Sequence, residues 1–512
     1  MSNTPPAIEL KGICKSFGPV QANKDISIRV APGTIHGIIG ENGAGKSTLM
    51  SILYGFYKAD RGKVFVHGAE INIRDSQTAI AAGIGMVFQH FKLVENFTVL
   101  ENIILGAEQN NILARALSQA RKTLQTLEQE YELKVELDAV IEDINVGMQQ
   151  RVEILKALYR GANILILDEP TGVLTPAEAD QLFRILKRLR AEGKTVLLIT
   201  HKLREIMDVT DWVSVMRQGK MVGHIKTSDT SPEQLAGKMV GRPVLLRVNK
   251  SPAQPKHPVL QVEDLKVVDY MGVERIKGID ITIRAGEILG IAGVAGNGQS
   301  ELLKVLGGMQ AGSGTIRMNG QRVALTGKHS DGQARRAHGI AHVPEDRQRE
   351  GLILEYYAWE NIAFGYHRDP IYRKNRITMN NAAVRNDTVQ KMDRFDVRPR
   401  NPWIKAMNFS GGNQQKIIVA REIERDPDLL LIGQPTRGVD IGAIEFVHQQ
   451  IINLRDKGKA VLLVSVELSE ILSLADRIAV MFDGRIMGER DPNSTNEQEL
   501  GLLMAGMSDV EH

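Results

Sequence analysis

Cysteine is almost absent from this sequence of 512 residues, in which Cys14 is the only one. A single thiol cannot form an internal disulfide, and it cannot supply the ligands of a zinc cage or an iron–sulfur cluster. Long apolar runs are missing as well, since no stretch approaches the ~18 consecutive apolar residues of a membrane span. Neither sign of charge dominates, because 64 basic and 61 acidic residues leave a formal net charge of +3. So small an excess argues against nucleic acid as the main partner.

The first residues, MSNTPPAIELKG, contain no apolar core of a signal peptide, and we therefore expect the chain to stay in the cytoplasm. The composition is that of a globular protein, with 43% hydrophobic and 24% charged residues. It excludes the disordered, collagen-like and low-complexity classes. Short apolar runs, such as residues 164–167 and 460–466, predict buried strands.

Much of the first half of the sequence is repeated in the second half. Residues 31–49, APGTIHGIIGENGAGKSTL, are matched by residues 284–302, RAGEILGIAGVAGNGQSEL. Residues 149–175 match residues 414–440 in the same way. Matches of this kind across both halves predict two copies of one domain.

The expected boundary between the two copies is a proline-rich stretch, RPVLLRVNKSPAQPKHP. We predict a first domain over residues 1–241, a linker over residues 242–258 and a second domain over residues 259–512. In both copies short apolar strands alternate with helical patterns, and one of these patterns is an amphipathic helix over residues 113–131. This alternation predicts an α/β fold with a mainly parallel sheet.

The most specific motif of the first copy is a glycine-rich loop, GENGAGKS, between an apolar strand and a helix. This context predicts a phosphate-binding loop, in which backbone N–H groups surround phosphates at a helix N-terminus. Lys46 would supply a positive charge to the β- and γ-phosphates, and the Ser47 hydroxyl would bind Mg²⁺. The motif assigns to the nucleotide Gly40, Glu41, Asn42, Gly43, Ala44, Gly45, Lys46, Ser47 and Thr48.

Acidic residues end a second predicted strand of the first copy. Asp168 and Glu169 follow the apolar run, so that the first carboxylate can hold Mg²⁺ and the second can polarise the attacking water. A third predicted strand, residues 196–200, ends in His201, which we expect to contact the γ-phosphate. Together with the glycine-rich loop, these residues predict hydrolysis of a nucleoside triphosphate.

With these motifs, both halves resemble the ATP-binding cassette of membrane transporters over nearly the whole chain. The resemblance implies two tandem P-loop NTPase domains, each with a mainly parallel sheet and a helical subdomain, which bind ATP and Mg²⁺. It adds Gln89, after the strand GIGMVF, to the catalytic and metal-binding residues. It links Gln89 to a helical segment over residues 90–145 that touches the membrane partner. It also implies that Phe17 stacks on adenine, and Tyr270 stands at the same spacing in the second copy.

The second copy lacks the charged groups of the first. A neutral amide, Gln299, replaces the lysine of the phosphate loop and cannot take over its charge. The residues at the positions of Asp168, Glu169, His201 and Gln89 are, in that order, Gly433, Gln434, Val466 and Glu345. We therefore expect the second copy to have lost both the metal anchor and the group that polarises water.

The family's signature loop differs in the opposite direction. The second copy reads FSGGNQQK, whose glycine N–H groups can approach a γ-phosphate and whose Ser410 can donate a hydrogen bond. The first copy reads INVGMQQR, with Asn145 in place of the serine and a β-branched Val146 that hinders close approach. The loop after the second strand follows the same division, with Asp440 in the second copy and Thr175 in the first.

In the family that this chain resembles, two cassettes pair head to tail, and each ATP lies between one phosphate loop and the other cassette's signature. Applied to this chain, the resemblance implies a pseudo-dimer formed within one polypeptide. The competent groups of the first copy then share one composite site with Ser410, Gly411, Gly412 and Asp440. The altered groups share the other site. We therefore predict one hydrolytic site and one site that at most holds nucleotide.

Two cassettes on one chain without a membrane span resemble the energising subunit of bacterial monosaccharide importers and of related nucleoside importers. The resemblance implies integral membrane permease subunits as partners and a periplasmic or lipid-anchored solute-binding protein. It places the chain as a peripheral subunit at the cytoplasmic face of the plasma (inner) membrane. The stretches NVGMQQRVEILKALYRGANILILDEPT and GVAGNGQSEL look closer to the nucleoside branch, and ribose, galactose or another simple sugar is the alternative.

Paired cassettes also occur in soluble proteins that work on ribosomes or on damaged DNA. The DNA-repair type needs zinc cysteines and the ribosome-recycling type needs an iron–sulfur cluster, so that the single cysteine excludes both. The translation-factor type has a long charged helical linker and two competent sites, whereas here the linker is short and one site is altered. A nucleotide-gated scaffold without catalysis is disfavoured because Glu169 is present.

Overall fold

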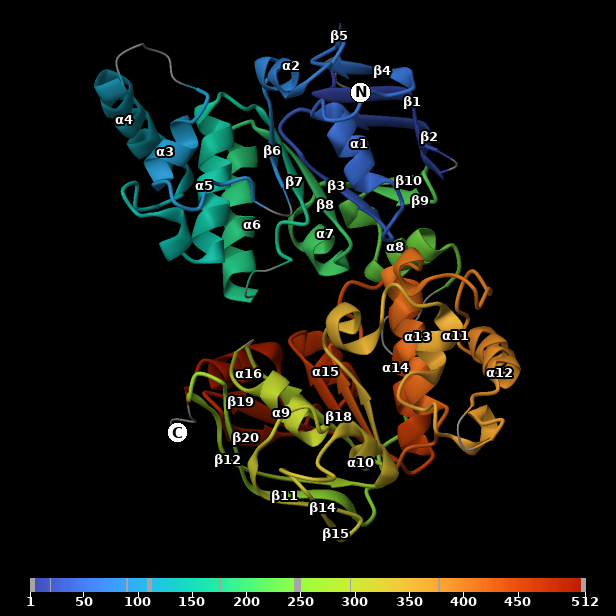
Figure 1. Ribbon diagram of the computed structural model, residues 1–512. Helices are drawn as coiled ribbons and strands as arrows, with labels where there is room; N and C mark the ends of the chain where they lie inside the picture. Colours follow the sequence, from blue (N-terminus) through green and yellow to red (C-terminus); the bar gives the residue numbers. More distant parts are fainter. Residues whose placement is uncertain are drawn as a thin grey trace. The chain divides into compact units, whose positions relative to one another are not determined.

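The computed structural model describes residues 5–18, 20–88, 91–107, 113–172, 174, 176–243, 250–294, 296–375 and 378–507. The chain folds into two compact units, Met1–Leu246 and Arg247–His512. Each unit contains a six-stranded, mainly parallel sheet and a four-stranded antiparallel sheet (Figure 1). The α/β fold expected from the alternation of strands and helices is therefore confirmed in both units.

In the first unit the six-stranded sheet has the order β10-β9-β3-β8-β7-β6. Neighbours from β9 to β6 are parallel, and β10 pairs antiparallel with β9. These strands are β3 (Ile35–Gly40), β6 (Ile84–Val87), β7 (Ile164–Asp168), β8 (Thr195–Thr200), β9 (Trp212–Arg217) and β10 (Lys220–Lys226). The antiparallel sheet, in the order β2-β1-β4-β5, contains β1 (Ile8–Phe17), β2 (Val20–Val30), β4 (Arg61–Val66) and β5 (Ala69–Ile71).

The helices of the first unit include a group on the β6 side of the sheet, in which α3, α4 and α5 pack together (Figure 1). The helix expected over residues 113–131 is confirmed as α4. The α-helices are α1 (Lys46–Leu53), α2 (Ser76–Ala81), α3 (Val99–Ile104), α4 (Leu113–Tyr131), α5 (Val146–Tyr159), α6 (Pro176–Ala191), α7 (Leu203–Val209) and α8 (Pro232–Val240). Short 3₁₀ turns are η1 (Ile141–Asp143) and η2 (Thr227–Asp229).

The second unit repeats this topology, with the sheet orders β16-β17-β18-β13-β19-β20 and β12-β11-β14-β15. Its strands are β11 (Pro258–Val268), β12 (Glu274–Arg284), β13 (Ile288–Ala292), β14 (Ser313–Met318), β15 (Gln321–Val323), β16 (Ile340–Val343), β17 (Leu429–Gly433), β18 (Ala460–Ser465), β19 (Arg477–Phe482) and β20 (Arg485–Arg490). Its α-helices are α9 (Gln299–Leu306), α10 (Gly332–Ala337), α11 (Ala358–Ala363), α12 (Asn381–Arg394), α13 (Gly411–Ile423), α14 (Ile441–Asp456), α15 (Leu468–Leu474) and α16 (Glu497–Met504). A π-helical turn, η3 (Arg347–Gly351), and the 3₁₀ turns η4 (Pro370–Tyr372) and η5 (Ala406–Asn408) complete the unit.

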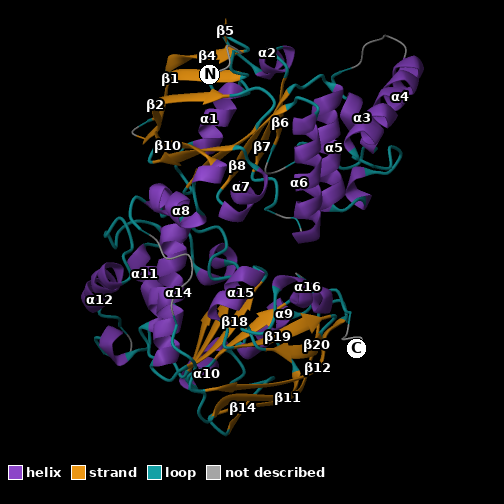
Figure 2. Ribbon diagram, turned by 180° about the vertical axis from the view of Figure 1, so that it is seen from behind, coloured by secondary structure: helices purple, strands orange, loops and turns teal. Residues whose placement is uncertain are grey.

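Both faces of each parallel sheet are buried, which explains why its strands are continuous apolar runs. Along β7, Leu165 and Leu167 pack in a core shared with α3, α4, α5 and α6, whereas Ile164 and Ile166 pack in a second core with α1 and the antiparallel sheet. Strand β17 alternates between two cores in the same way. Helices accordingly flank the strands in both units (Figure 2). The buried strands expected from the short apolar runs are confirmed as β7 and β18.

The connection between the units differs from the expected linker over residues 242–258 at its C-terminal end. Pro258 is already the first residue of β11. Lys250 is bound to the second unit, because its ammonium donates to two backbone oxygens at the end of α15, at 2.9 and 2.6 Å, and to Asp476 Oδ1 at 3.0 Å. Residues 250–258 therefore belong structurally to the second unit, which proline content alone does not reveal.

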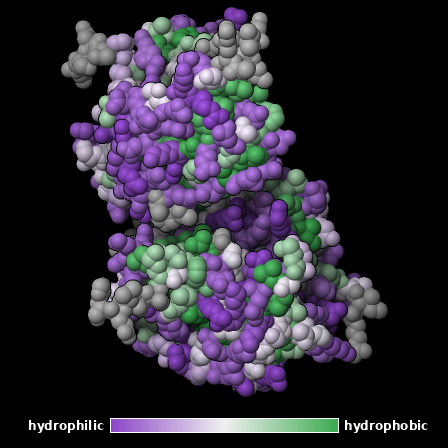
Figure 3. All heavy atoms as spheres, turned by 90° about the vertical axis from the view of Figure 1, so that its left-hand side faces the viewer, coloured by the Kyte–Doolittle hydropathy of each residue, from purple (hydrophilic) through white to green (hydrophobic). Residues whose placement is uncertain are grey.

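Among the helices in the described part of the chain, none combines the length and the apolar character that crossing a bilayer requires. The helix α4 has 19 residues, but charged side chains occur along it. On the face drawn in Figure 3 hydrophilic residues predominate, and hydrophobic residues form small patches.

Candidate active site

The predicted catalytic residues of the first unit follow three neighbouring strands. Strands β3, β8 and β7 are parallel and adjacent, and their carboxyl ends lead into the phosphate loop, His201 and the pair Asp168 and Glu169. Open α/β sheets bind their ligands at this edge, where the carboxyl ends of parallel strands meet. The strand order therefore gathers residues that are distant in the sequence.

The phosphate loop ends in the first turn of α1, and its shape depends on glycine. Gly45 caps this helix with φ 97°, a left-handed conformation that glycine adopts without strain. A Cβ atom at this position would lie 2.2 Å from the backbone oxygen of Ala22. Asn23 stabilises the loop, because its buried side chain donates from Nδ2 to the Gly45 oxygen at 3.1 Å. The sequence motif did not indicate Asn23, which lies outside the motif and reaches it only through the fold.

The side chain of Lys46 folds back over the loop. Its Nζ donates to the backbone oxygens of Gly40 at 2.7 Å and Glu41 at 3.1 Å, and the residue is only 5% exposed. Burial lowers the pKa of Lys46, and the carboxylates of Glu169, Asp168 and Glu41 act in the opposite direction. The loop thus holds an ammonium group on neutral carbonyl oxygens, which an anionic phosphate can replace as a stronger partner.

Ser47 and Asp168, which the sequence assigns to Mg²⁺, lie next to each other. The Ser47 hydroxyl donates to Asp168 Oδ1 at 3.4 Å. Burial raises the pKa of Asp168 above its usual value, although the hydrogen bond from Ser47 opposes this effect. A largely buried carboxylate beside a hydroxyl is the kind of oxygen donor set that suits Mg²⁺, which also binds substrate phosphates and water. The residues present therefore fit the ion.

Glu169 is held in place by both its backbone and its side chain. Its φ is 48°, and its N–H donates to the Ile199 oxygen of β8 at 2.8 Å. Its Oε1 lies 3.0 Å from Nδ1 of His201 in a hydrogen bond. This hydrogen bond is the main cause of the lowered pKa of Glu169. Glu169 is therefore an ionised carboxylate at neutral pH, the state that accepts a hydrogen bond from a water nucleophile.

The two aromatic residues that stand at the same spacing before the phosphate loops, Phe17 and Tyr270, are both exposed. Phe17 ends β1 with 43% of its surface exposed, and its ring meets Tyr57 edge-on at 5.1 Å between centroids. Tyr270, its counterpart in the second unit, is 95% exposed between β11 and β12. An exposed aromatic face can accept a stacked base. Gln89 and Thr175 lie outside the described residues.

The signature residues of the second unit form one cluster at the start of α13. Ser410 caps this helix, with its Oγ accepting from the Asn413 N–H at 3.4 Å and from Asn413 Nδ2 at 2.9 Å. Asp440 caps α14 by accepting from the Ala443 N–H at 2.8 Å. The two caps adjoin, because a Cβ atom on Gly412 would lie 2.8 Å from Asp440 Oδ2. The fold thus places the signature next to Asp440, although the two are 28 residues apart in the sequence.

Arg347 is a residue of this cluster that the sequence analysis missed. Its guanidinium donates to the Arg437 oxygen at 2.5 Å and to the Gly438 oxygen at 3.3 Å, in the loop after β17. A Cβ atom on Gly411 would lie 2.5 Å from the same guanidinium. Arg347 therefore ties the signature to the neighbouring loop. Its position two residues after Glu345 carries no motif that would have revealed this contact.

The model of the ABC transporter family matches residues 23–172 and 276–437, which include the phosphate loop and the acidic strand end of the first unit and their counterparts in the second. The chain belongs to the ABC transporter family. Both units are therefore ABC cassettes, and the chain is an ATPase that binds ATP.

Relatives with assigned names match the ABC chain over both cassettes. The nucleoside import ATP-binding protein NupA of Lactococcus lactis subsp. cremoris is 47% identical over 98% of each chain. The guanosine import ATP-binding protein NupO of Bacillus subtilis is 46% identical, also over 98% of each chain. The glucose import ATP-binding protein TsgD13 of Haloferax volcanii is 41% identical over 99% of this chain and 96% of that protein. Each of these alignments therefore spans both units of this chain.

The signature stretch of the first ABC cassette keeps its helix cap with a different residue. The Asn145 side chain accepts from the Met148 N–H at 2.9 Å and so caps α5 as Ser410 caps α13. Asparagine and serine are about equally good at this position. The fold of the helix start therefore survives the substitution, and the change at Asn145 removes a hydroxyl donor rather than the helix cap.

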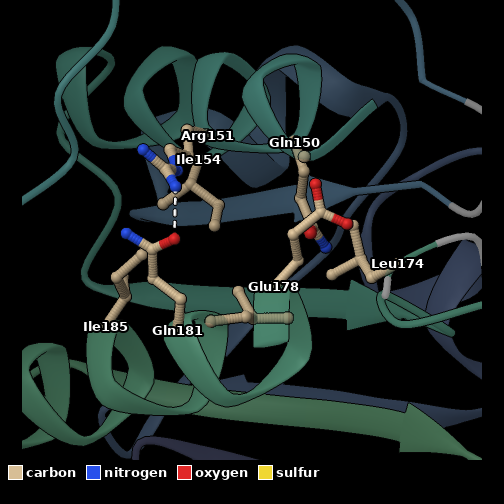
Figure 4. A pocket seen from close by; sticks show the side chains of 9 residues that line it. Gln150, Arg151, Ile154, Leu174, Glu178, Gln181 and Ile185 are labelled. Atoms are coloured by element: carbon tan, nitrogen blue, oxygen red, sulfur yellow. Dashed lines mark hydrogen bonds between the residues drawn. The ribbon is translucent and has the colours of Figure 1, made fainter. Parts of the chain in front are cut away.

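A carboxylate also lies over the signature glycine of the first cassette, but it comes from a different position. A Cβ atom on Gly147 would lie 2.6 Å from Glu178 Oε1, in α6. Figure 4 shows Glu178 facing Gln150 across the two helices. Arg151 donates to Gln181 Oε1 at 2.5 Å. Glu178 thus takes a place that corresponds to that of Asp440 in the second cassette, which the sequence comparison at Thr175 did not predict.

The phosphate loop of the second cassette keeps its backbone without its charge. Gly298 caps α9 with φ 104°, close to the value at Gly45. The Gln299 amide is buried and donates to the Val294 oxygen at 3.1 Å, as Lys46 does to the equivalent carbonyl. Gln434 has φ 48° like Glu169. The second cassette therefore keeps the backbone geometry of the first at these positions but lacks the Lys46 ammonium and the Glu169 carboxylate.

We expect Gly45→Ala to lower the free energy of unfolding of the first unit clearly more than Gly43→Ala. Both glycines have positive φ, 97° and 81°, so that both substitutions incur about 1–2 kcal/mol of backbone strain. Only Gly45 lacks space for a methyl group, which adds about 1–3 kcal/mol, whereas nothing lies within 4 Å of a Cβ at Gly43. Denaturant titration of both variants measures the difference, and equal losses would contradict it.

Proposed function

We propose that this ABC ATPase energises the import of nucleosides by hydrolysing ATP at the phosphate loop of its first cassette. The observation that carries the proposal is the hydrogen-bonded pair of Glu169 and His201, 3.0 Å apart, at the same sheet edge as Lys46. Lys46 meets the negative charge of the β- and γ-phosphates. Glu169 accepts a hydrogen bond from the attacking water, and His201 keeps the carboxylate ionised and oriented.

Magnesium is part of the proposed site. Ser47 and Asp168 would hold the ion, and the resemblance adds Gln89 to them. When bound with ATP, Mg²⁺ neutralises charge on the phosphate oxygens. The buried Asp168 supports this assignment, because burial raises its pKa and a cation would offset the cost of keeping the carboxylate ionised.

The signature of the second cassette is proposed to complete the same site. In the first turn of α13 the N–H groups of Gly411 and Gly412 have no partners within the helix, as at every helix N-terminus. Ser410 and Asp440 frame this turn. Backbone N–H groups arranged in this way stabilise phosphate charge as it develops during hydrolysis. The division of the charged and the glycine-rich motifs between the cassettes supports the proposal of a pseudo-dimer within one chain, with one hydrolytic site.

The partners follow from the role of an import ATPase. We propose that the chain binds integral membrane permease subunits from the cytoplasmic face of the plasma (inner) membrane, as a peripheral subunit. A solute-binding protein, periplasmic or lipid-anchored, delivers the solute to these permeases without touching this chain. The helical segments around α3 to α5 and around α11 to α12 are the expected contacts with the membrane subunits.

Nucleosides are preferred over sugars as the solute because the relatives named for nucleoside and guanosine import are 47% and 46% identical. The relative named for glucose import is 41% identical, which makes a monosaccharide importer the second candidate. A ribosome-associated ATPase is the third and has no support among these relatives. No residue of this chain touches the solute in an importer of this kind. Only a transport measurement therefore distinguishes nucleosides from sugars as the solute.

Cells that lack this chain are expected to lose the uptake of radiolabelled nucleosides, guanosine included, and to keep the uptake of glucose and ribose. The wild-type chain should restore uptake, because it couples ATP hydrolysis to the permeases. Glu169→Gln should fail to restore it, whereas Gln434→Ala, at the equivalent position of the second cassette, should restore it. Loss of sugar uptake with nucleoside uptake retained would replace the proposal with the monosaccharide alternative.

A further inference from the structure

Arg347 joins two separate segments of the second cassette. Its guanidinium donates from Nη1 to the Arg437 oxygen at 2.5 Å and from Nη2 to the Gly438 oxygen at 3.3 Å, in the loop between β17 and α14. Its Nε donates to Gln414 Oε1 at 3.4 Å, in the signature helix α13. A planar guanidinium presents its donors in a fixed arrangement, which an ammonium group does not. One side chain therefore connects α13 with the loop after β17.

Gly411, the first glycine of the signature, leaves room for this side chain. A Cβ atom on Gly411 would lie 2.5 Å from Arg347 Nη2 and 2.8 Å from the Gly438 oxygen, which are the two partners in one of these hydrogen bonds. A side chain at position 411 would therefore displace the guanidinium. The contact between Arg347 and the loop after β17 depends on glycine at this position of the signature.

The turn that carries Arg347 is longer than its counterpart in the first cassette. The N–H groups of Val94 and Ile353 occupy equivalent places, since each donates to an asparagine of the following helix, at 2.7 and 2.9 Å. Four residues separate Gln89 from Val94, whereas seven separate its counterpart Glu345 from Ile353. The three extra residues accompany the π-helical turn η3. Single π-helical turns are frequent at functional sites.

The arginine and the intact signature occur in the same cassette. Counted from the ends of β6 and β16, the residue of the first cassette that corresponds to Arg347 is Phe91, which packs against the hydrophobic core of its own unit. The residue that corresponds to Gly411 is Val146. The first cassette thus lacks both the guanidinium and the glycine that makes room for it. This pairing indicates that the arginine serves the signature rather than the general fold of a cassette.

We propose that Arg347 is a positioning residue for ATP hydrolysis, which holds the signature, Ser410–Gly412, and the loop that leads to Asp440 in one fixed arrangement around the γ-phosphate of the nucleotide. The N–H groups in the first turn of α13 have no partners within the helix and can meet phosphate charge. Such donors stabilise developing charge most when they are in place before the reaction. This proposal rests on the proposed function, because the phosphate belongs to ATP on the first phosphate loop.

Arg347→Met, measured in the complex with the permeases, tests the proposal. Methionine keeps most of the length of the side chain but cannot donate hydrogen bonds. It should lower kcat for ATP by roughly ten- to hundredfold, as expected when groups that meet the substrate lose their alignment. The KM for ATP and equilibrium binding of ATP to the first cassette should stay at wild-type values, because the phosphate loop with Lys46 is unchanged. A purely structural role would lower the melting temperature and leave kcat of the folded protein unchanged.

Two further variants in the same turn serve as controls. The side chain of Arg349 is 88% exposed, and its Nε lies 3.8 Å from Asp346 Oδ2. Arg349→Met should therefore keep the wild-type kcat. Arg347→Lys should give a kcat between those of the wild-type chain and Arg347→Met, because one ammonium group cannot reproduce the paired donation to the Arg437 and Gly438 oxygens.

Gly411→Ala tests whether Arg347 acts through the signature. The added methyl group would occupy space that the guanidinium now fills. We expect Gly411→Ala to lower kcat, since it displaces Arg347. In that background Arg347→Met should lower kcat by less than about twofold further, because two substitutions that break one shared contact are not additive.

A wild-type kcat in Arg347→Met would overturn the proposal, as would an undiminished further loss in the Gly411→Ala background. If Arg347→Met does not fold, a wild-type kcat in Arg347→Lys overturns it instead. With any of these results, slow turnover in Glu169→Gln would leave the proposed function standing. A wild-type complex without ATP turnover would reject the proposed function, and the role of Arg347 with it.

Discussion

Glu169→Gln is expected to slow ATP turnover by the assembled transporter about 10²- to 10⁴-fold, the usual contribution of a positioned general base. The substitution keeps the length of the side chain and its ability to form a hydrogen bond with His201. In the wild-type chain Glu169 Oε1 lies 3.0 Å from His201 Nδ1. It removes the negative charge that we propose polarises the attacking water. ATP binding should persist, since the phosphate loop and Lys46 are untouched. Phosphate release from the complex with its permeases measures the first effect, and equilibrium binding of ATP measures the second.

Gln434 offers the matched control for this experiment. It has the same φ of 48° as Glu169. Its N–H donates to the Val464 oxygen of β18 at 2.8 Å, just as the Glu169 N–H donates to the Ile199 oxygen of β8. Gln434→Ala therefore disturbs an equivalent backbone position without removing a charge. We expect turnover near the wild-type rate. A comparable loss in both variants would mean that the strand end, rather than the carboxylate of Glu169, limits the reaction.

The features of the fold that could be predicted are those encoded in consecutive residues. The run at residues 164–167 is apolar on both faces because β7 is covered on both sides. The helix over residues 113–131 is amphipathic, and α4 has the same bounds. Strand order is different, since it depends on which segments pair across the sheet. Local patterns therefore do not predict the adjacency of β3, β8 and β7, on which the candidate site depends.

The same distinction applies to the candidate site. Motifs indicated Lys46, Asp168, Glu169 and His201 because each stands at the end of an apolar strand or in a glycine-rich loop. The contact of Asn23 with the loop and that of Arg347 with the signature are long-range and leave no local pattern.

Glu345 is the instructive case among the substitutions of the second cassette. Aligned position by position, the change from Gln89 to Glu345 and the change from Asp168 to Gly433 read as two separate losses. In the structure the two changes are linked, because the Glu345 side chain occupies the space that a side chain at position 433 would need. Compensation between neighbouring strands cannot be seen until the strands are placed next to each other.

Lys46→Ala is expected to reduce turnover by about 10²- to 10³-fold, the usual effect of removing one preorganised group that meets developing charge. The Lys46 ammonium donates to the backbone oxygens of Gly40 and Glu41, in the loop that we propose binds the phosphates. Gln299 is its matched control, because the amide has the same loop position and also donates to a loop carbonyl. Gln299→Ala removes no charge, and turnover should stay close to wild type in the same assay.

These paired variants test the asymmetry of the two cassettes directly. If both cassettes hydrolysed ATP in alternation, truncation at either loop would slow the complex, and equal losses from Lys46→Ala and Gln299→Ala would refute a single hydrolytic site. Gln299→Lys sharpens the comparison, because it restores a cation to the second loop while Gln434 and Val466 still stand in place of the base and the histidine. Turnover should not increase in that variant. A second ATP hydrolysed per cycle would show that charge at the loop, rather than the carboxylate at the strand end, is what the second cassette lacks.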